Sequence, residues 1–125
     1  MIQIPLPTDI RVHLKSRTLE LVYEEGNYEL TAEFLRVHSP SAEVRGHGIG
    51  QETLQTGKRL VGIKGIEPSG NYALKIIFDD GHDSGLYTWE YLYDLAHNQQ
   101  SYWQDYLAKL DAEGGSRDGG LIARG

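Results

Sequence analysis

The sequence predicts a single α+β domain with a small, mostly antiparallel β-sheet, one short helix and two carboxy-terminal helices. Three observations lead to this prediction. Short segments before residue 88 alternate apolar and polar residues, as half-buried strands do. Gly, Pro and Asn lie between those segments and favour turns there. Beyond residue 88 the apolar residues recur every three or four positions, which is the period of a helix.

The amino-terminal third predicts a β-hairpin followed by a short helix. Residues 10–14 and 18–23 alternate in polarity and are joined by three polar residues, a pattern typical of two antiparallel strands. Residues 30–35 predict the start of a helix. Thr31 is placed to cap its first turn, and Glu33 lies near the positive end of the helix dipole.

The middle of the chain predicts a long loop and a second hairpin. Pro40 and three glycines make regular structure improbable up to about residue 58. Residues 60–67 and 72–78 then form two apolar segments around a Pro-Ser-Gly-Asn turn. Residues 84–87 predict a short extended piece leading into the first carboxy-terminal helix.

Two helices and a tail complete the chain. Thr88 is a plausible cap for the first helix, and Ser101 with Gln104 forms a capping box that predicts the start of the second. The sequence from residue 112 is Gly-rich and has no periodicity. We therefore expect one domain over residues 1–111 and a disordered tail over 112–125.

Composition narrows the classes of function. The 125 residues carry a net charge of −6 without a basic stripe, so nucleic acid is not an expected partner. No segment reaches the roughly 20 apolar residues of a membrane span, and the amino terminus has no signal-peptide pattern. Cysteine is absent, which removes disulfides and thiolate ligands. We expect a cytoplasmic protein that contacts no membrane.

Two runs of residues carry a family resemblance. They are Ser-Pro-Ser-Ala-Glu-Val at 39–44 and the segment from Gly81-His82 to Tyr91, and Leu35-Arg36-Val37 adds to them. Together with the element order, they resemble the amino-terminal domain of gamma-butyrobetaine hydroxylase-like oxygenases, which in bacteria also occurs as a stand-alone protein. The resemblance covers roughly residues 8 to 110.

The resemblance implies a structural zinc site that this chain has lost. Much of the family carries Cys-Pro-Cys-x-x-Cys and a His around zinc, at positions matched here by Ser39, Ser41, Val44 and His82. Hydroxyls bind zinc weakly beside thiolates and Val44 cannot bind it, so we expect no cofactor. We expect the serines and His82 to hold the loop by hydrogen bonds, with Val44 packed inward.

A rebuilt metal site remains an alternative. It would hold zinc, iron or nickel with nitrogen and oxygen ligands from the loop and the acidic turn. Its candidate ligands are His38, His47 and His82, helped by Glu43 or Asp83.

Catalytic motifs are missing. Oxygenases of this kind hold iron with a His-x-Asp/Glu pair, but the residues two after the five histidines are Lys15, Pro40, Ile49, Ser84 and Gln99. A hydrolytic alternative would use the turn Asp79, Asp80, His82, Asp83 and Ser84. Neighbouring residues of one turn point in different directions, whereas real triads come from distant segments. We therefore interpret this segment as a polar turn and expect no enzyme.

The predicted function is that of a non-catalytic stand-alone accessory domain that binds a protein partner. Aromatic side chains are dense in the helices, and Tyr and Arg are favoured at interfaces, although core packing is an alternative for them. The surface candidates are Arg36, Arg45, Tyr91, Tyr93 and Tyr102. Two other functions stay open: metal handling linked to iron–sulfur cluster assembly, as in related domains attached to such carriers, and catalysis at the His82 turn.

Overall fold

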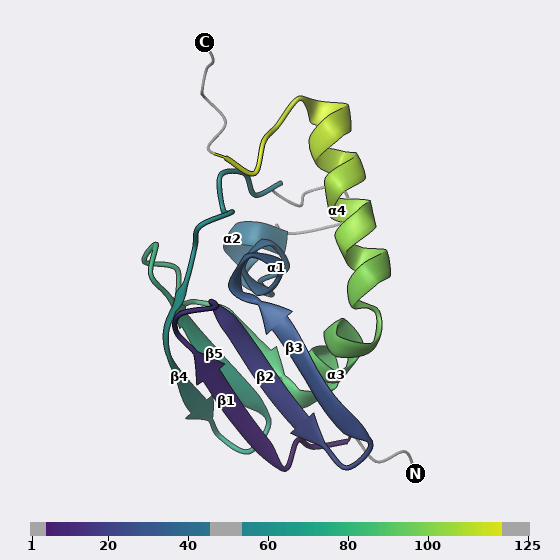
Figure 1. Ribbon diagram of the computed structural model, residues 1–125. Coiled ribbons are helices and arrows are strands. Elements are labelled where there is room, and N and C mark those ends of the chain that lie inside the picture. Colours follow the sequence, from purple (N-terminus) through teal and green to yellow (C-terminus); the bar gives the residue numbers. More distant parts are fainter. Residues whose placement is uncertain (1–4, 46–53, 119–125) are drawn as a thin grey trace.

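The computed structural model describes residues 5–45 and 54–118 and confirms the α+β class (Figure 1). The strands form two antiparallel sheets, ordered β1-β2-β3 and β4-β5-β6. In chain order the elements are β1 (Asp9–His13), β2 (Thr18–Tyr23), β3 (Gly26–Thr31), α1 (Ala32–Val37), α2 (Ala42–Arg45), β4 (Ile63–Ser69), β5 (Ala73–Phe78), β6 (Leu86–Thr88), α3 (Trp89–His97) and α4 (Gln99–Glu113).

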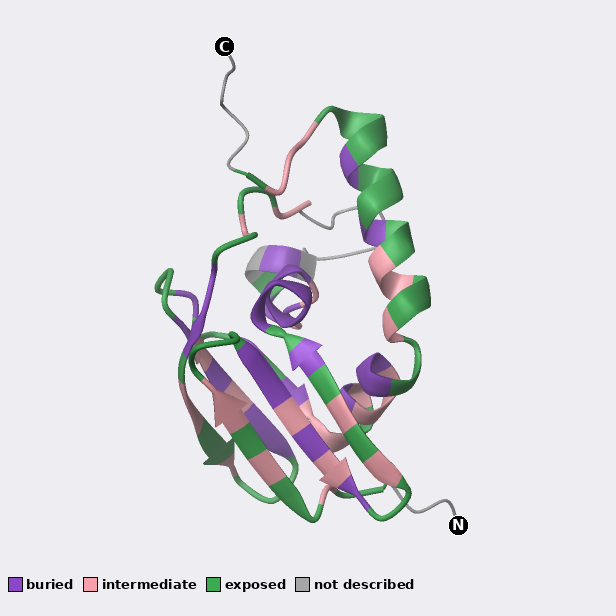
Figure 2. Cartoon of the chain, viewed as in Figure 1, coloured by how far each residue is buried: buried purple, intermediate pink, exposed green. Residues whose placement is uncertain are grey.

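The core lies between the two sheets and is closed by α1 and α3. Leu19 and Leu21 of β2 are fully buried, as is Ile76 of β5. Buried and partly exposed residues alternate along β2 and β5 (Figure 2), as expected for strands with one face in a core. Helix α1 lies across one end of the sheets and contributes buried Phe34, and α3 contributes buried Leu92.

Both predicted hairpins are confirmed, and one strand was missed. No strand was predicted between residue 23 and the helix start at 30–35, but the chain turns at Glu24 and Glu25 and continues as β3, paired with β2. The outward Asn27 and Glu29 made the segment look like a loop, although Leu30 between the polar positions is buried. The turn between β2 and β3 has two residues, a length that is common in antiparallel hairpins.

The helix starts were predicted correctly at two positions and wrongly at one. Thr31 caps α1 and accepts a hydrogen bond of 3.1 Å from the Phe34 amide, and Thr88 caps α3 in the same way. Helix α4 begins at Gln99 rather than at Ser101, with Asn98 at its cap position. The amide of Tyr102 donates to the Asn98 carbonyl at 3.0 Å. Helical hydrogen bonding therefore begins before Ser101, the first residue of the predicted capping box. Helix α2 lies within the segment predicted to be irregular.

Residues 112–118, which were predicted to belong to a disordered tail, have a defined structure. Helix α4 runs to Glu113 and ends at Gly114, whose φ of 70° is left-handed, a conformation that favours glycine. The following segment pairs with the loop before β4 through hydrogen bonds from Gly57 to Ser116 (2.9 Å) and from Arg59 to Arg117 (3.0 Å). Arg117 in this segment also binds the carboxylate of buried Glu33. Residues 119–125 lie outside the described residues, and the prediction of one domain stays a prediction.

Within residues 5–45 and 54–118, none of the helices combines the length and the apolar character that a membrane crossing requires.

Candidate functional site

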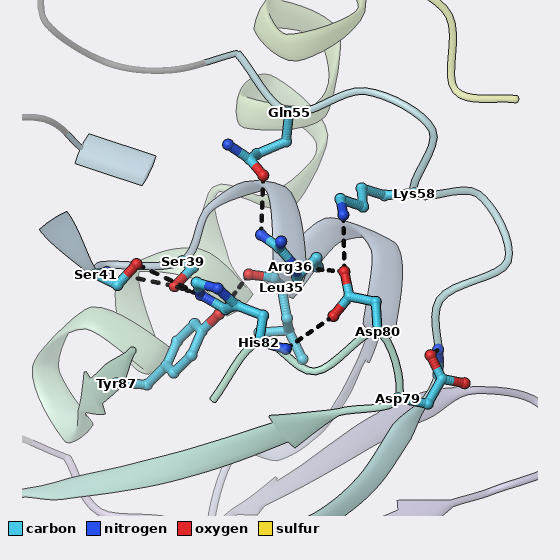
Figure 3. A network of polar contacts seen from close by, with 11 residues as sticks. Leu35, Arg36, Ser39, Ser41, Gln55, Lys58, Asp79, Asp80, His82 and Tyr87 are labelled. Atoms are coloured by element: carbon cyan, nitrogen blue, oxygen red, sulfur yellow. Dashed lines mark hydrogen bonds and ion pairs between the residues drawn. The ribbon is translucent and has the colours of Figure 1, made fainter. Parts of the chain in front are cut away.

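The turn after β5 faces the segment that follows α1. Gly81, with φ of 91°, takes the left-handed position of the turn. The Phe78 amide then bonds to the His82 carbonyl at 3.0 Å. This turn aims the His82 imidazole at Ser39 and Ser41, as Figure 3 shows. The two segments are 43 residues apart between Ser39 and His82, so only folding brings them together.

Ser39, Ser41 and His82 form a buried cluster of polar side chains. The Ser39 Oγ lies 2.8 Å from the His82 Nε2, and the Ser41 Oγ lies 3.4 Å from the same nitrogen. The Ser41 amide donates to the Ser39 Oγ at 3.3 Å. The exposed fractions of the three residues are 1%, 6% and 8%. Water hardly reaches these groups, so their stability depends on the contacts that they make with one another.

The backbone around the cluster is closely packed. A β-carbon added to Gly85 would lie 2.4 Å from the Ser39 Oγ and 3.1 Å from the Pro40 Cδ. Two tyrosine hydroxyls also hold the end of α1, since Tyr87 donates to the Leu35 carbonyl and Tyr91 donates to the His38 carbonyl at 2.6 Å. Carbonyls at a helix end lack partners within the helix. The two tyrosines supply those partners and tie the end of α1 to β6 and α3.

Asp80 connects the same turn to α1 and to the loop before β4. Its Oδ2 accepts from the Arg36 Nε at 2.9 Å and from the Lys58 Nζ at 2.7 Å, and its Oδ1 accepts from the His82 amide at 3.2 Å. Burial alone would raise the pKa of Asp80. The hydrogen bonds from Lys58, the His82 amide and Arg36 outweigh burial and lower this pKa to about 2. The carboxylate is therefore an anionic anchor at neutral pH.

The residues at the four positions of the implied zinc site do not fit that metal. Folding brings Ser39, Ser41 and His82 together, and Val44 is buried as predicted. The set nevertheless offers one imidazole, two hydroxyls and an alkyl group, whereas structural zinc takes four nitrogen or sulfur donors. The nitrogen that would bind a metal is instead hydrogen bonded to Ser39.

The described ligands of the proposed rebuilt site are not grouped. His38 turns its Nδ1 to the Phe34 carbonyl at 2.8 Å, and burial lowers the pKa of His38. Asp83 is exposed. Within the ranges 5–45 and 54–118, His38, His82 and Asp83 do not form a trio of metal-ligand atoms within 4.8 Å of one another. His47 and the side chain of Glu43 lie outside the described residues.

The predicted interaction residues have different environments. Arg36 is only 7% exposed and binds Asp80 and Gln55, so its assignment to the surface is wrong: its charge is neutralised inside by Asp80. Tyr91, Tyr93 and Tyr102 are half-buried and pack against the core. The Tyr102 hydroxyl donates to Asp94 at 2.8 Å. The side chain of Arg45 lies outside the described residues.

A hollow beside β6 was not predicted. It measures about 500 Å³ and lies between the loop after α1 and the start of α3. Its lining combines apolar groups with carboxylates: Pro40, Leu86, Thr88, Glu90, Tyr91 and Asp94. The side chain of Leu86 stays 38% exposed there. The sequence around Leu86 does not show that this residue is exposed. Its exposure depends on the length of β6 and on the position of that strand in the sheet.

Comparisons with known proteins support the resemblance. The family model described as gamma-butyrobetaine hydroxylase-like, N-terminal, matches residues 10–93. An NMR solution structure of a protein is 54% identical, with a TM-score of 0.83 and 98% coverage of both chains. A second NMR structure is 50% identical, with a TM-score of 0.77, and covers 96% of this chain and 89% of its own.

A crystal structure is also similar. It is that of a protein of unknown function from Acidithiobacillus ferrooxidans ATCC 23270, which belongs to the DUF971 family. It is 37% identical, with a TM-score of 0.60, and the match covers 72% of this chain and 91% of that one. No curated protein matches the chain.

Proposed function

Because the chain belongs to the gamma-butyrobetaine hydroxylase-like N-terminal family, we propose that it is a non-catalytic accessory domain that binds a protein partner and keeps its shape without zinc. The observation that carries this proposal is the buried contact between Ser39 and His82. It joins the two segments that the implied zinc site would join. A hydrogen-bonded cluster thus takes the structural role of the metal.

The groups that could act in catalysis are committed to holding the fold. Ser39 is 1% exposed, so a substrate cannot approach its hydroxyl as it would a nucleophile. Asp80 has three donors and a pKa of about 2, which suits an ion-pair anchor rather than a general acid or base near neutral pH. Asp79 accepts from the Gly62 amide at 2.9 Å. These contacts favour a structural role for Asp79 and Asp80.

The hollow beside β6 is the surface that best suits a partner. Apolar Leu86 and the half-buried ring of Tyr91 lie in it beside the carboxylates of Glu90 and Asp94. The chain itself carries a net charge of −6. A partner segment with an apolar side chain next to Lys or Arg would complement both features.

A matched pair of variants tests this surface. Leu86 and Leu107 are exposed to nearly the same extent, 38% and 37%, but Leu107 lies on α4, outside the hollow. Equal amounts of three chains would be immobilised: wild type, Leu86→Asp and Leu107→Asp. The proteins that each chain captures would then be quantified by mass spectrometry. We expect a specific protein to be lost with Leu86→Asp and retained with Leu107→Asp. Equal capture by both variants would contradict the assignment.

Zinc dependence is tested separately. The wild-type protein should keep the same melting temperature after a strong chelator, and zinc should not bind at His82. The triple variant S39C/S41C/V44C restores the thiolates and serves as the positive control, since it should take up one zinc more per chain than the wild type. A wild-type melting temperature that falls with the chelator would contradict metal-independent folding. Neither iron–sulfur metal handling nor catalysis at the turn is favoured by a specific contact among the described residues.

A further inference from the structure

A second cluster of ligand-type side chains lies far from the His82 turn in sequence, on the outer face of the first sheet. It consists of His13 on β1, Glu20 on β2 and Glu29 on β3. The His13 Nε2 lies 2.8 Å from the Glu20 Oε1 and 4.0 Å from the Glu29 Oε2. One donor atom from each residue lies within 4.8 Å of the other two, and no other such trio occurs within the described ranges.

The sheet register explains why these side chains meet. Glu20 stands directly opposite Glu29 on the neighbouring strand, and His13 is diagonal to Glu20 because it pairs with Thr18. Two like charges directly opposite each other on a sheet are destabilising unless a cation lies near them. Arg11, directly opposite Glu20 on β1, supplies part of that positive charge from 4.0 Å, but its Nε binds Asp9 at 2.9 Å.

The spacing of the three donor atoms is near the spacing of ligands around a bound metal ion. Ligands about 2.0–2.2 Å from zinc are about 3.3 Å apart in a tetrahedral site, so small side-chain rotations would bring the three donors into place. The Asn27 amide donates to the second oxygen of Glu20 at 2.6 Å. This contact leaves the Oε1 directed at His13 and orients the ligand as outer-shell groups do in metal sites.

We propose that the outer face of the first sheet binds a divalent transition-metal ion through the His13 imidazole and the carboxylates of Glu20 and Glu29. One imidazole with two carboxylates is a donor set for zinc and its neighbours in the first transition row, whereas magnesium and calcium prefer oxygen ligands alone. Three protein ligands also leave coordination positions for water or for a group from a partner.

Zinc titration of the full chain tests the proposal. Zinc chloride would be added to metal-free protein and followed by calorimetry and by NMR signals of the backbone and the imidazoles. We expect one ion per chain, with the largest shifts at His13 and in β1, β2 and β3. Excess magnesium should not displace it. His13→Ala and Glu29→Gln should each weaken binding by at least about tenfold, since even outer-shell changes cost this much.

A matched control separates this trio from an ordinary surface histidine. His97 is similarly exposed and lies 3.3 Å from one carboxylate, that of Glu25, so it lacks the second acidic ligand. His97→Ala should leave zinc binding unchanged. Absence of binding at millimolar zinc, unchanged binding in Glu29→Gln, or loss of binding in His97→Ala would overturn the proposal. None of these results depends on the partner surface at Leu86.

Discussion

Two histidines of this domain have contrasting surroundings. His82 is 8% exposed and contacts two serine hydroxyls, whereas the side chain of His13 is 39% exposed and lies 2.8 Å from a carboxylate. A carboxylate is costly to bury, whereas a hydroxyl loses less on leaving water. The buried imidazole accordingly lies against hydroxyls and the more exposed one lies against a carboxylate. The inner histidine is suited to holding two segments together, and the outer one can exchange its neighbours for a ligand.

Removing the inner imidazole should have the largest effect. His82→Ala leaves a cavity and takes away the shared partner of Ser39 and Ser41. We expect a loss of about 3 kcal/mol in the free energy of unfolding, measured by urea denaturation. His13→Ala is the control and should change this free energy by less than about 1 kcal/mol. Equal losses in the two variants would remove the contrast between the sites.

The packing around Ser39 and His82 can be tested without replacing either of these residues. The added methyl of Gly85→Ala would lie 2.4 Å from the Ser39 Oγ, so the loop must move. We expect a loss of about 2 kcal/mol in urea denaturation, with NMR shifts centred on Ser39 and His82. Gly65→Ala is the control, since a β-carbon there meets nothing within 4 Å. Loss of stability in the control alone would show that the loop is not closely packed.

Acid should weaken the inner region through Asp80. The folded pKa of about 2 lies below the ordinary value of 3.8. The ionised carboxylate therefore stabilises the fold above about pH 4, and this contribution is lost as the pH falls toward 2. Because Asp80 is partly exposed and screened by solvent, the shift corresponds to about 1 kcal/mol. Asp80→Asn should be less stable than wild type by about this amount at pH 7, and the difference should shrink in urea denaturation at pH 2. A difference independent of pH would contradict the ion-pair role.

The smallest effect should come from the outer site. Glu29→Gln removes one of two opposed carboxylates and relieves repulsion on an exposed face. We expect the free energy of unfolding to change by less than about 0.5 kcal/mol, in the stabilising direction, measured by thermal denaturation without metal. A clear loss of stability would mean that Glu29 supports the fold, and the two regions would then differ less than proposed.

Local sequence signals predicted much of the fold. Thr31 and Thr88 were identified as caps because capping depends on the side chain and on residues a few positions away. The hairpins followed from alternation. The strand at Gly26–Thr31 and the early start of α4 at Gln99 were missed, because pairing with β2 and backbone winding after Asn98 override the local polarity.

The candidate sites were less predictable. The meeting of Ser39 with His82 was anticipated only through a family resemblance, and Arg36 was misplaced on the surface. Arg36 lies two residues after Phe34 on a six-residue helix, whose described side chains are all buried. No periodic pattern distinguishes an inner from an outer face on so short a helix. Its partner Asp80 is 44 residues away, beyond the reach of a local argument.

The sequence by itself determined the class of the fold, the caps of two helices and the loss of thiolates from the loop, since these depend on residue type and short spacing. Tertiary structure decided which polar groups meet. Ser39 reaches His82 because the turn after β5 packs against the end of α1, and His13 meets two glutamates because of the register of three strands. Contacts of this kind form when distant segments bury a common core, and the geometry of that core sets their partners.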